Sequence, residues 1–135
     1  LQKAHVFGAT IAKVMEAEDG MLAVWGTGEE ERDLLHVSDL VRGFQLAIEK
    51  QSTPYELYNI GSGQAISIKD LVEKIIDVSG KTLLLEHDLS KPSNKTSFCL
   101  DCEKAKVELG WEPSVSLEEG IQKTLAWYKS NIKPE

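Results

Sequence analysis

Residues 24–39 read Val-Trp-Gly-Thr-Gly-Glu-Glu-Glu-Arg-Asp-Leu-Leu-His-Val-Ser-Asp. The apolar run 21–25 predicts a short strand that stops at Gly26 and Gly28, where the backbone turns tightly. A second apolar run, 34–37, predicts another strand, and Ser38 stands where a helix would begin. Strand, turn and helix following one another in this way are typical of an α/β fold.

The composition excludes several classes of protein. The chain has 135 residues, of which 41% are hydrophobic and 27% charged, as in an ordinary globular protein. The formal net charge of −7 argues against a nucleic-acid partner. No apolar run approaches the roughly 20 residues of a membrane span, so no membrane partner is expected either. No signal peptide opens the sequence, which favours a cytoplasmic location. We therefore expect one domain, residues 1–135, with a modest core.

The spacing of apolar residues predicts a small mixed α/β domain of about five helices and three to four short strands. Helices are expected at 4–18, 39–50, 68–79, 102–109 and 117–130. The strand candidates are 21–25, 34–37, 55–60 and 82–86, with 98–100 as a very short addition. These are too few for a complete doubly wound sheet. Residues 111–113 are predicted to be a linker.

Two of the predicted helices have further signals in the sequence. Ser67 resembles the start of a capping box, and Gly80 stands at the C′ position of the same helix. For helix 39–50 the predicted apolar stripe consists of Leu40, Val41, Phe44, Ala47 and Ile48. The glycines Gly61 and Gly63 are interpreted as turn residues rather than as contacts to a cofactor phosphate, because no third glycine completes a dinucleotide fingerprint.

Cys99 and Cys102 have the C-x-x-C spacing of redox dithiols and of half a zinc site. A zinc site requires two further ligands, and neither a second cysteine pair nor a paired-histidine motif occurs in the sequence. We therefore favour two small, partly buried thiols beside a helix cap, and expect no metal site. A redox or metal role remains the alternative.

Arg32 follows three consecutive glutamates at a junction between loop and strand. An isolated arginine in such a place suits bidentate recognition of a phosphate. The alternative is a surface arginine that balances the glutamates.

Three stretches carry a resemblance to a known family. Residues 25–39 resemble the W-G-x-G-x-x-x-R-[DE]-[FL]-[LI]-[HY]-V-x-D segment of extended short-chain dehydrogenases/reductases, the NAD(P)-dependent epimerases, dehydratases and reductases of nucleotide sugars. Residues 5–13 resemble that family's H-V-[IF]-x-A-x-[IL]-x-[KR], and residues 100–121 resemble its structural signature around L-G-W. The motifs are most similar to those of the GDP-L-fucose synthase branch. The resemblance implies the C-terminal, substrate-binding portion of a Rossmann-type enzyme.

The resemblance also implies roles for individual residues. It places His5 near the nicotinamide end of the cofactor, Lys13 near the substrate's phosphates, Trp25 beside the substrate and Arg32 on the diphosphate. Taken without the resemblance, His5 is more often a capping or surface residue, and Trp25 is equally well a core tryptophan.

Lys91 lies in Ser-Lys-Pro-Ser-Asn, residues 90–94, which resembles the family's S-K-P-D-G loop near the nucleotide. Ser93 and Asn94 depart from that pattern, so the base remains open. We expect Arg32, Lys13 and Lys91 to supply the local cations that a nucleotide diphosphate requires on an acidic protein.

The redox chemistry of the family requires motifs that this sequence does not contain. There is no G-x-x-G-x-x-G turn, and no lysine stands four residues after Tyr55, Tyr58 or Tyr128. We therefore expect no catalytic residue in this chain, no activity of the chain alone, and no tight binding of NAD or NADP by it. The cofactor would belong to an N-terminal Rossmann domain that the sequence lacks.

The sequence thus predicts the nucleotide-sugar-binding part of an NAD(P)-dependent epimerase, dehydratase or reductase. Its partners would be the nucleotide-sugar substrate and the missing Rossmann domain, and the family implies a homodimeric parent. The alternative is a freestanding, non-catalytic binding or interaction module of the same fold.

Overall fold

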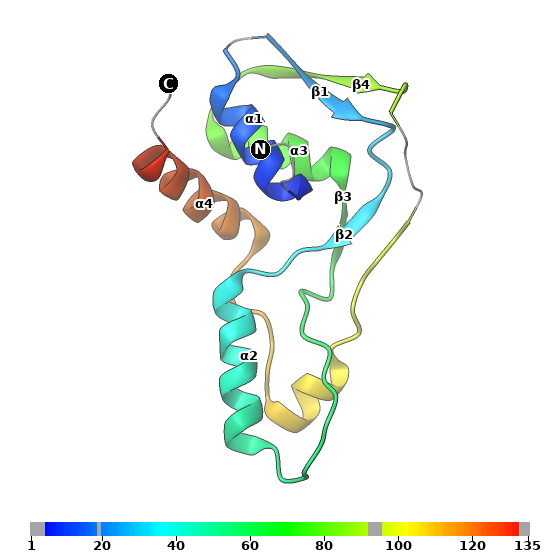
Figure 1. Ribbon diagram of the computed structural model, residues 1–135, viewed down its shortest axis with the longest axis vertical. Helices are drawn as coiled ribbons and strands as arrows, with labels where there is room; N and C mark the ends of the chain where they lie inside the picture. The colour runs from blue at the N-terminus through cyan, green and yellow to red at the C-terminus, as the bar shows by residue number, and fades with distance from the viewer. Residues whose placement is uncertain (1–4, 19, 92–95, 133–135) are drawn as a thin grey trace. The chain divides into compact units, whose positions relative to one another are not determined.

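The computed structural model describes residues 5–18, 20–91 and 96–132, which divide into two compact units (Figure 1). The first unit comprises the segments Leu1–Glu30, Ser67–Thr96 and Glu118–Glu135, and the second comprises Glu31–Ile66 and Ser97–Leu117. Within the described residues there are five helices and four strands, which confirms the predicted mixed α/β class.

The first unit is built on a parallel pair of strands, β1 (Gly20–Trp25) and β4 (Leu83–Asp88). Helices α1 (Val6–Glu16) and α3 (Ile68–Ser79) pack against each other beside this pair (Figure 1). Helix α4 (Leu117–Asn131) adds buried apolar side chains. The core is aliphatic and consists of Ile11, Ala12, Val14, Leu22, Val24, Ile68, Leu71, Val72, Ile75, Ile76, Leu83, Ile121 and Leu125.

The predicted caps of α3 are confirmed. The hydroxyl of Ser67 accepts the backbone N–H of Asp70 at 3.0 Å. Gly80 ends the helix with φ +74°, a left-handed conformation that glycine adopts without steric cost. Beyond it, the Nζ of Lys81 donates to the carbonyls of Met15 and Ala17 at the end of α1, which binds the two helix ends together.

The second unit contains β2 (Glu31–Asp33), β3 (Ala65–Ser67) except its last residue, α2 (Val37–Lys50) and a π-helical turn, η1 (Ala105–Leu109). Strands β2 and β3 form a two-stranded sheet. The small core is formed by Ala105, Leu109 and Trp111, against which Leu35, Leu46, Ala47, Tyr58, Ile60 and Cys102 pack.

Trp111 is the centre of that core, although it lies in the irregular segment that follows η1. Its side chain is fully buried, and its indole N–H donates to the carbonyl of Asp39 at 2.9 Å. Residues 111–113 form no helix or strand, as expected of a linker, but the burial of Trp111 was not predicted; it follows because Gly110 (φ +65°) turns the chain back immediately after η1.

The strand predicted at 34–37 is also wrong. The strand lies three residues earlier, at β2, and α2 already begins at Val37. His36, not Ser38, is the N-cap: its Nδ1 accepts the backbone N–H of Ser38 at 3.3 Å. The first turn of a helix has backbone N–H groups that lack a partner within the helix, and the His36 ring nitrogen accepts one of them. An extended strand would have no need of such a cap.

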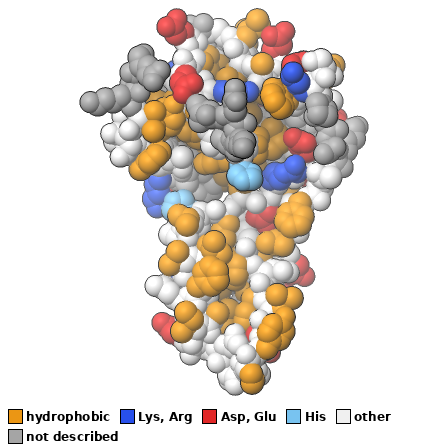
Figure 2. Space-filling view, viewed as in Figure 1, with side chains coloured by type: hydrophobic (Ala, Val, Ile, Leu, Met, Phe, Trp, Pro, Cys, Tyr) orange, Lys and Arg blue, Asp and Glu red, His pale blue; other side chains and the backbone are white. Residues whose placement is uncertain are grey.

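Most of the apolar stripe predicted for α2 faces outward, whereas Ala47 packs against the core. Leu40, Val41, Phe44 and Ile48 are exposed, and apolar side chains are visible on the surface over this helix (Figure 2). The buried positions are Asp39 and Gly43. A Cβ on Gly43 would lie 3.3 Å from the Trp111 indole nitrogen, so the helix approaches the core through its smallest residue.

Residues 55–60 and 98–100, both strand candidates, form no strand in the part of the chain that is described. Tyr58 and Ile60 pack against the core of the second unit instead. β-propensity alone does not produce a strand where no neighbouring strand accepts its hydrogen bonds.

Asp39 is a buried carboxylate with a full set of partners. It is 1% exposed and accepts hydrogen bonds from the Ser114 hydroxyl (2.6 Å), the N–H groups of Ser114 and Val115 (3.0 and 2.9 Å) and the Arg42 guanidinium (3.0 Å). Burial alone would raise the pKa of Asp39, but these hydrogen bonds, led by that of Ser114, lower it well below its usual range.

We expect Asp39→Ala to lower the free energy of unfolding by about 3 kcal/mol, because it leaves several buried donors without an acceptor. Urea unfolding followed by tryptophan fluorescence measures this change. Glu49→Ala on the exposed face of α2 is the control and should stay within about 0.5 kcal/mol of wild type. Equal losses in the two variants would contradict the structural role of Asp39.

We also expect the stability to fall in acid. The pKa of Asp39 in the fold is depressed below the unfolded value of about 3.9, so its stabilisation is complete above that pH and is lost as the pH drops through the folded pKa. The urea midpoint of the wild type should therefore decrease between pH 5 and pH 3, and that of Asp39→Asn should decrease less. A wild-type midpoint independent of pH in this range would contradict the prediction.

Candidate functional site

The end of the β1–β4 pair positions an exposed tryptophan. Trp25 is the last residue of β1 and lies opposite Asp88 in the parallel register. The pairing continues one step further, because the Gly26 N–H donates to the Asp88 carbonyl at 2.9 Å. The Trp25 side chain is 60% exposed, so it is not the core tryptophan that the sequence left as an alternative.

The turn that follows β4 carries Lys91. The carboxylate of Asp88 accepts the hydroxyl of Ser90 at 2.6 Å and its N–H at 3.1 Å, and the Lys91 N–H donates to the Asp88 carbonyl at 3.3 Å. The Ser90 hydrogen bonds are the main cause that lowers the pKa of Asp88. These bonds fix a tight turn, and the Lys91 Nζ lies 5.5 Å from the centre of the Trp25 ring.

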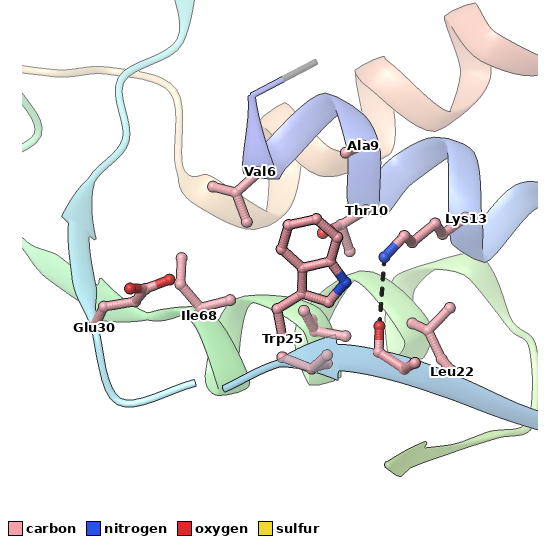
Figure 3. Close-up of a pocket in the computed structure, with 11 residues that line it drawn as sticks. Val6, Ala9, Thr10, Lys13, Leu22, Trp25, Glu30 and Ile68 are labelled. Carbon is pink, nitrogen blue, oxygen red and sulfur yellow. Dashed lines mark hydrogen bonds between the residues drawn. The ribbon is translucent and has the colours of Figure 1, made fainter. Parts of the chain in front are cut away.

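Lys13 reaches the same ring from a different element. It projects from α1, its Nζ donates to the Ala23 carbonyl at 3.4 Å, and it lies 5.9 Å from the centre of the Trp25 ring (Figure 3). The distances of the Lys13 and Lys91 Nζ atoms from the ring centre, 5.9 and 5.5 Å, are both within the range of a cation–π contact. Neither lysine forms an ion pair with another residue in the described part of the chain. Two ammonium groups at one aromatic ring form a site that attracts an anion.

A cavity of about 480 Å³ lies beside this ring, within the usual size range of ligand sites (Figure 3). It is enclosed by α1, β1 and the start of α3. Its lining is Val6, Ala9, Thr10, Lys13, Leu22, Ala23, Val24, Trp25, Glu30, Ile68 and Val72. Most of these side chains are apolar, so the cavity can accept a flat, partly apolar group while the lysines hold a charged one.

Glu30 is a residue of this cavity that the sequence did not identify. The sequence shows three adjacent glutamates, which we interpreted only as a balance to Arg32. The structure fixes the Glu30 backbone, because its carbonyl accepts the Ile68 N–H at 2.9 Å. Its half-buried side chain lines the cavity. No signal in the sequence distinguishes it from its two neighbours.

His5 occupies the N-cap position of α1 but its side chain makes no capping hydrogen bond. It is exposed and does not line the cavity that holds Lys13 and Trp25. Its predicted contact with a cofactor therefore stays a prediction.

Arg32 belongs to the second unit, in β2, where its guanidinium donates to the Glu31 carbonyl at 2.7 Å. The predicted contact with a diphosphate stays a prediction. In the S-K-P-S-N segment, Lys91 is described, whereas Pro92, Ser93 and Asn94 lie outside the described residues.

Asp33, beside Arg32, joins three segments of the second unit. Its carboxylate accepts the Ser62 N–H (2.7 Å) and hydroxyl (2.5 Å) and the N–H groups of Gly63 and Leu100 (both 3.1 Å). Burial raises the pKa of Asp33, but these hydrogen bonds outweigh it and lower the pKa below its ordinary value.

The Gly61–Gly63 turn is therefore committed to internal contacts. The N–H groups of Ser62 and Gly63 donate to Asp33, and that of Gly61 donates to the Cys102 sulfur at 3.2 Å. A Cβ on Gly61 would lie only 2.7 Å from a carboxylate oxygen of Asp33. These residues do not fit a cofactor pyrophosphate, because their donors already have acceptors.

The two cysteines are free thiols. Cys99 is exposed, whereas Cys102 is half-buried, and burial raises the pKa of its thiol. Within the described residues no group of three or more histidine, cysteine, aspartate or glutamate side chains gathers in a way that could hold a metal ion. None of the described helices is long and apolar enough to span a membrane.

Comparison with known proteins agrees with the sequence motifs. The family described as GDP-mannose 4,6 dehydratase matches residues 4–124. "Probable GDP-L-fucose synthase 1" of Oryza sativa subsp. japonica is 37% identical over 134 residues, which cover 97% of this chain and 40% of that protein. "GDP-L-fucose synthase 1" of Arabidopsis thaliana is likewise 37% identical over 136 residues, with 97% and 41% covered. The chain thus spans about two fifths of the length of these curated relatives.

Solved structures of similar fold are nucleotide-sugar enzymes. UDP-glucose 4-epimerase of Thermotoga maritima, solved with UDP-glucose, is 31% identical with a TM-score of 0.81, covering 97% of this chain and 41% of that one. dTDP-glucose 4,6-dehydratase of Bacillus anthracis, solved in complex with NAD, is 29% identical with a TM-score of 0.77, covering 94% and 40%. The structural relatives are thus Rossmann-type extended short-chain dehydrogenases/reductases.

Proposed function

This chain belongs to the GDP-mannose 4,6 dehydratase family, and we propose that it forms the C-terminal, substrate-binding part of an NAD(P)-dependent nucleotide-sugar epimerase, dehydratase or reductase. Similarity to GDP-L-fucose synthases over nearly the whole chain favours an enzyme of that kind. The parent protein would be a cytoplasmic homodimer in which a Rossmann domain, absent from this chain, holds NAD or NADP.

The observation that carries the proposal is the convergence of Lys13 and Lys91 on Trp25 at the mouth of an apolar cavity. A nucleotide diphosphate has the matching parts: a flat base, and a diphosphate whose negative charges require cations. The two lysines come from α1 and from the turn after β4, so the fold itself brings them together.

The chemical task of this chain is then to bind and orient. Lys13 and Lys91 neutralise the diphosphate, the Trp25 face packs against the nucleoside, and the cavity walls exclude water from it. Hydride transfer is chemistry that a nicotinamide supplies, and no described residue of this chain performs it. Holding the sugar in one orientation toward the missing domain contributes to the rate through positioning.

The alternative, a non-catalytic binding module of the same fold, makes the same use of this cavity. The sequence does not separate the two, because the tyrosine–lysine motif that it lacks would belong to the N-terminal part of an enzyme in the first case and would be lost in the second. The two readings differ in whether the chain restores turnover when it is joined to a Rossmann domain of a relative.

Replacing either lysine should weaken nucleotide binding. We expect Lys13→Ala and Lys91→Ala each to raise the Kd for GDP roughly fivefold, because each removes a charge-assisted contact at a partly exposed site. Isothermal titration calorimetry on the 135-residue chain measures this change. Lys129→Ala on the exposed surface of α4 removes the same charge and should leave the Kd unchanged. If all three variants bind alike, the lysine pair is not the diphosphate site.

The family resemblance also implies that Arg32 contacts the diphosphate of the substrate, and this role has its own test. We expect Arg32→Ala to raise the Kd for GDP roughly tenfold, and Arg32→Lys to raise it less, because lysine keeps the charge but loses the planar fork. The same titrations measure both variants. An unchanged Kd in Arg32→Ala would remove this residue from the site.

A further inference from the structure

The cavity beside Trp25 has opposite charges on its two sides. Figure 3 shows Lys13 on one side of the indole and Glu30 on the other, next to Ile68. The Glu30 carboxylate makes no hydrogen bond or ion pair with any other described residue, although it is half-buried against apolar side chains. A carboxylate so placed has acceptor oxygens available for a ligand.

This polarity defines how a nucleotide would lie, if the cavity binds one as proposed above. The diphosphate belongs at the side of Lys13 and Lys91, because the carboxylate repels it from the other side. The base then lies toward Glu30, along the apolar walls.

We propose that Glu30 is a base-selecting residue that favours guanine, by accepting the two adjacent N–H donors of its Watson–Crick edge. Guanine presents N1–H and the N2 amino group side by side, which matches the two oxygens of a carboxylate. Uracil and thymine present a single N3–H between two carbonyl oxygens, and those carbonyls repel a carboxylate. Adenine and cytosine each place a ring-nitrogen acceptor beside their amino group, so only one donor meets Glu30.

The apolar surroundings sharpen this selection. The side chains of Val6 and Ile68 offer no polar group that could compensate the repulsion between a carboxylate and a facing carbonyl. A site discriminates strongly when its polar group forms hydrogen bonds with one ligand and repels another. An apolar pocket that separates ligands only by their size discriminates less.

The test compares GDP and UDP by calorimetry on the 135-residue chain. We expect the wild type to bind GDP at least about tenfold more tightly than UDP. Glu30→Gln offers one acceptor and one donor in place of two acceptors, so the preference should fall to within about threefold, mainly through weaker GDP binding. Glu73→Gln, which makes the same charge change on the exposed face of α3, is the control and should keep the wild-type preference.

The possible results separate this inference from the proposed function. A preference for GDP that Glu30→Gln abolishes and Glu73→Gln retains supports the inference. Equal binding of GDP and UDP by the wild type, or a preference that Glu30→Gln leaves intact, overturns the role of Glu30 while nucleotide binding itself stands. No binding of either nucleotide at millimolar concentration overturns the proposed function, and the inference with it.

Discussion

The register of the parallel β1–β4 pair is the constraint on which the candidate site depends. Because Trp25 lies opposite Asp88, the turn after β4 starts beside the indole and carries Lys91 toward it. Side chains alternate along a strand, so a slip of one residue would turn Trp25 to the opposite face and separate it from Lys91. Burial of Leu22 and Val24 opposes such a slip, since both would leave the core. The hydrophobic core thus fixes the position of a polar site.

The second unit is ordered by carboxylates more than by apolar packing. Its buried core is small, with Ala105, Leu109 and Trp111 at the centre. Asp33 and Asp39 each collect hydrogen bonds from segments distant in the sequence, Asp33 from Ser62, Gly63 and Leu100, and Asp39 from Ser114 and Val115. Hydrogen bonds from backbone N–H groups to a carboxylate depend on distance and angle, so they fix the position of a loop more narrowly than apolar contacts do. Both aspartates lie in residues 24–39, so this single stretch binds the distant segments of the second unit together.

The sequence predicted those elements whose signals are local. The strand at 21–25 and the helix at 68–79 follow from apolar spacing together with Ser67 and Gly80 at the helix ends, and no distant residue is needed to recognise them. The inner face of α2 could not be predicted in this way. Helical periodicity identified the stripe through Phe44, but Trp111, far along the chain, selects the neighbouring face by contacting Asp39 and Gly43.

The residues of the candidate site likewise divide into those that the sequence predicted and those whose position depends on distant contacts. Lys13, Trp25 and Lys91 were predicted from the resemblance to a family, and the fold brings the three together. Glu30 could not be found, because three identical glutamates differ only in where the backbone directs them. Its direction depends on the Ile68 N–H, which belongs to a helix 38 positions away.

In an acidic protein, the fold must keep the lysines of a cationic site away from the many carboxylates with which they could pair. The formal charge of −7 offers each lysine many carboxylates, yet in the described residues Lys13 and Lys91 contact the same indole and no carboxylate. The α1 backbone positions Lys13, and the Asp88–Lys91 turn, which the Ser90 hydrogen bonds stabilise, positions Lys91. In the function proposed above, an anion meets both ammonium groups already in place, so less of the binding energy is spent on ordering them. Under the same proposal, the acidic remainder of the surface would repel anions that cannot reach the lysines, which would favour a ligand whose uncharged portion can also enter the cavity.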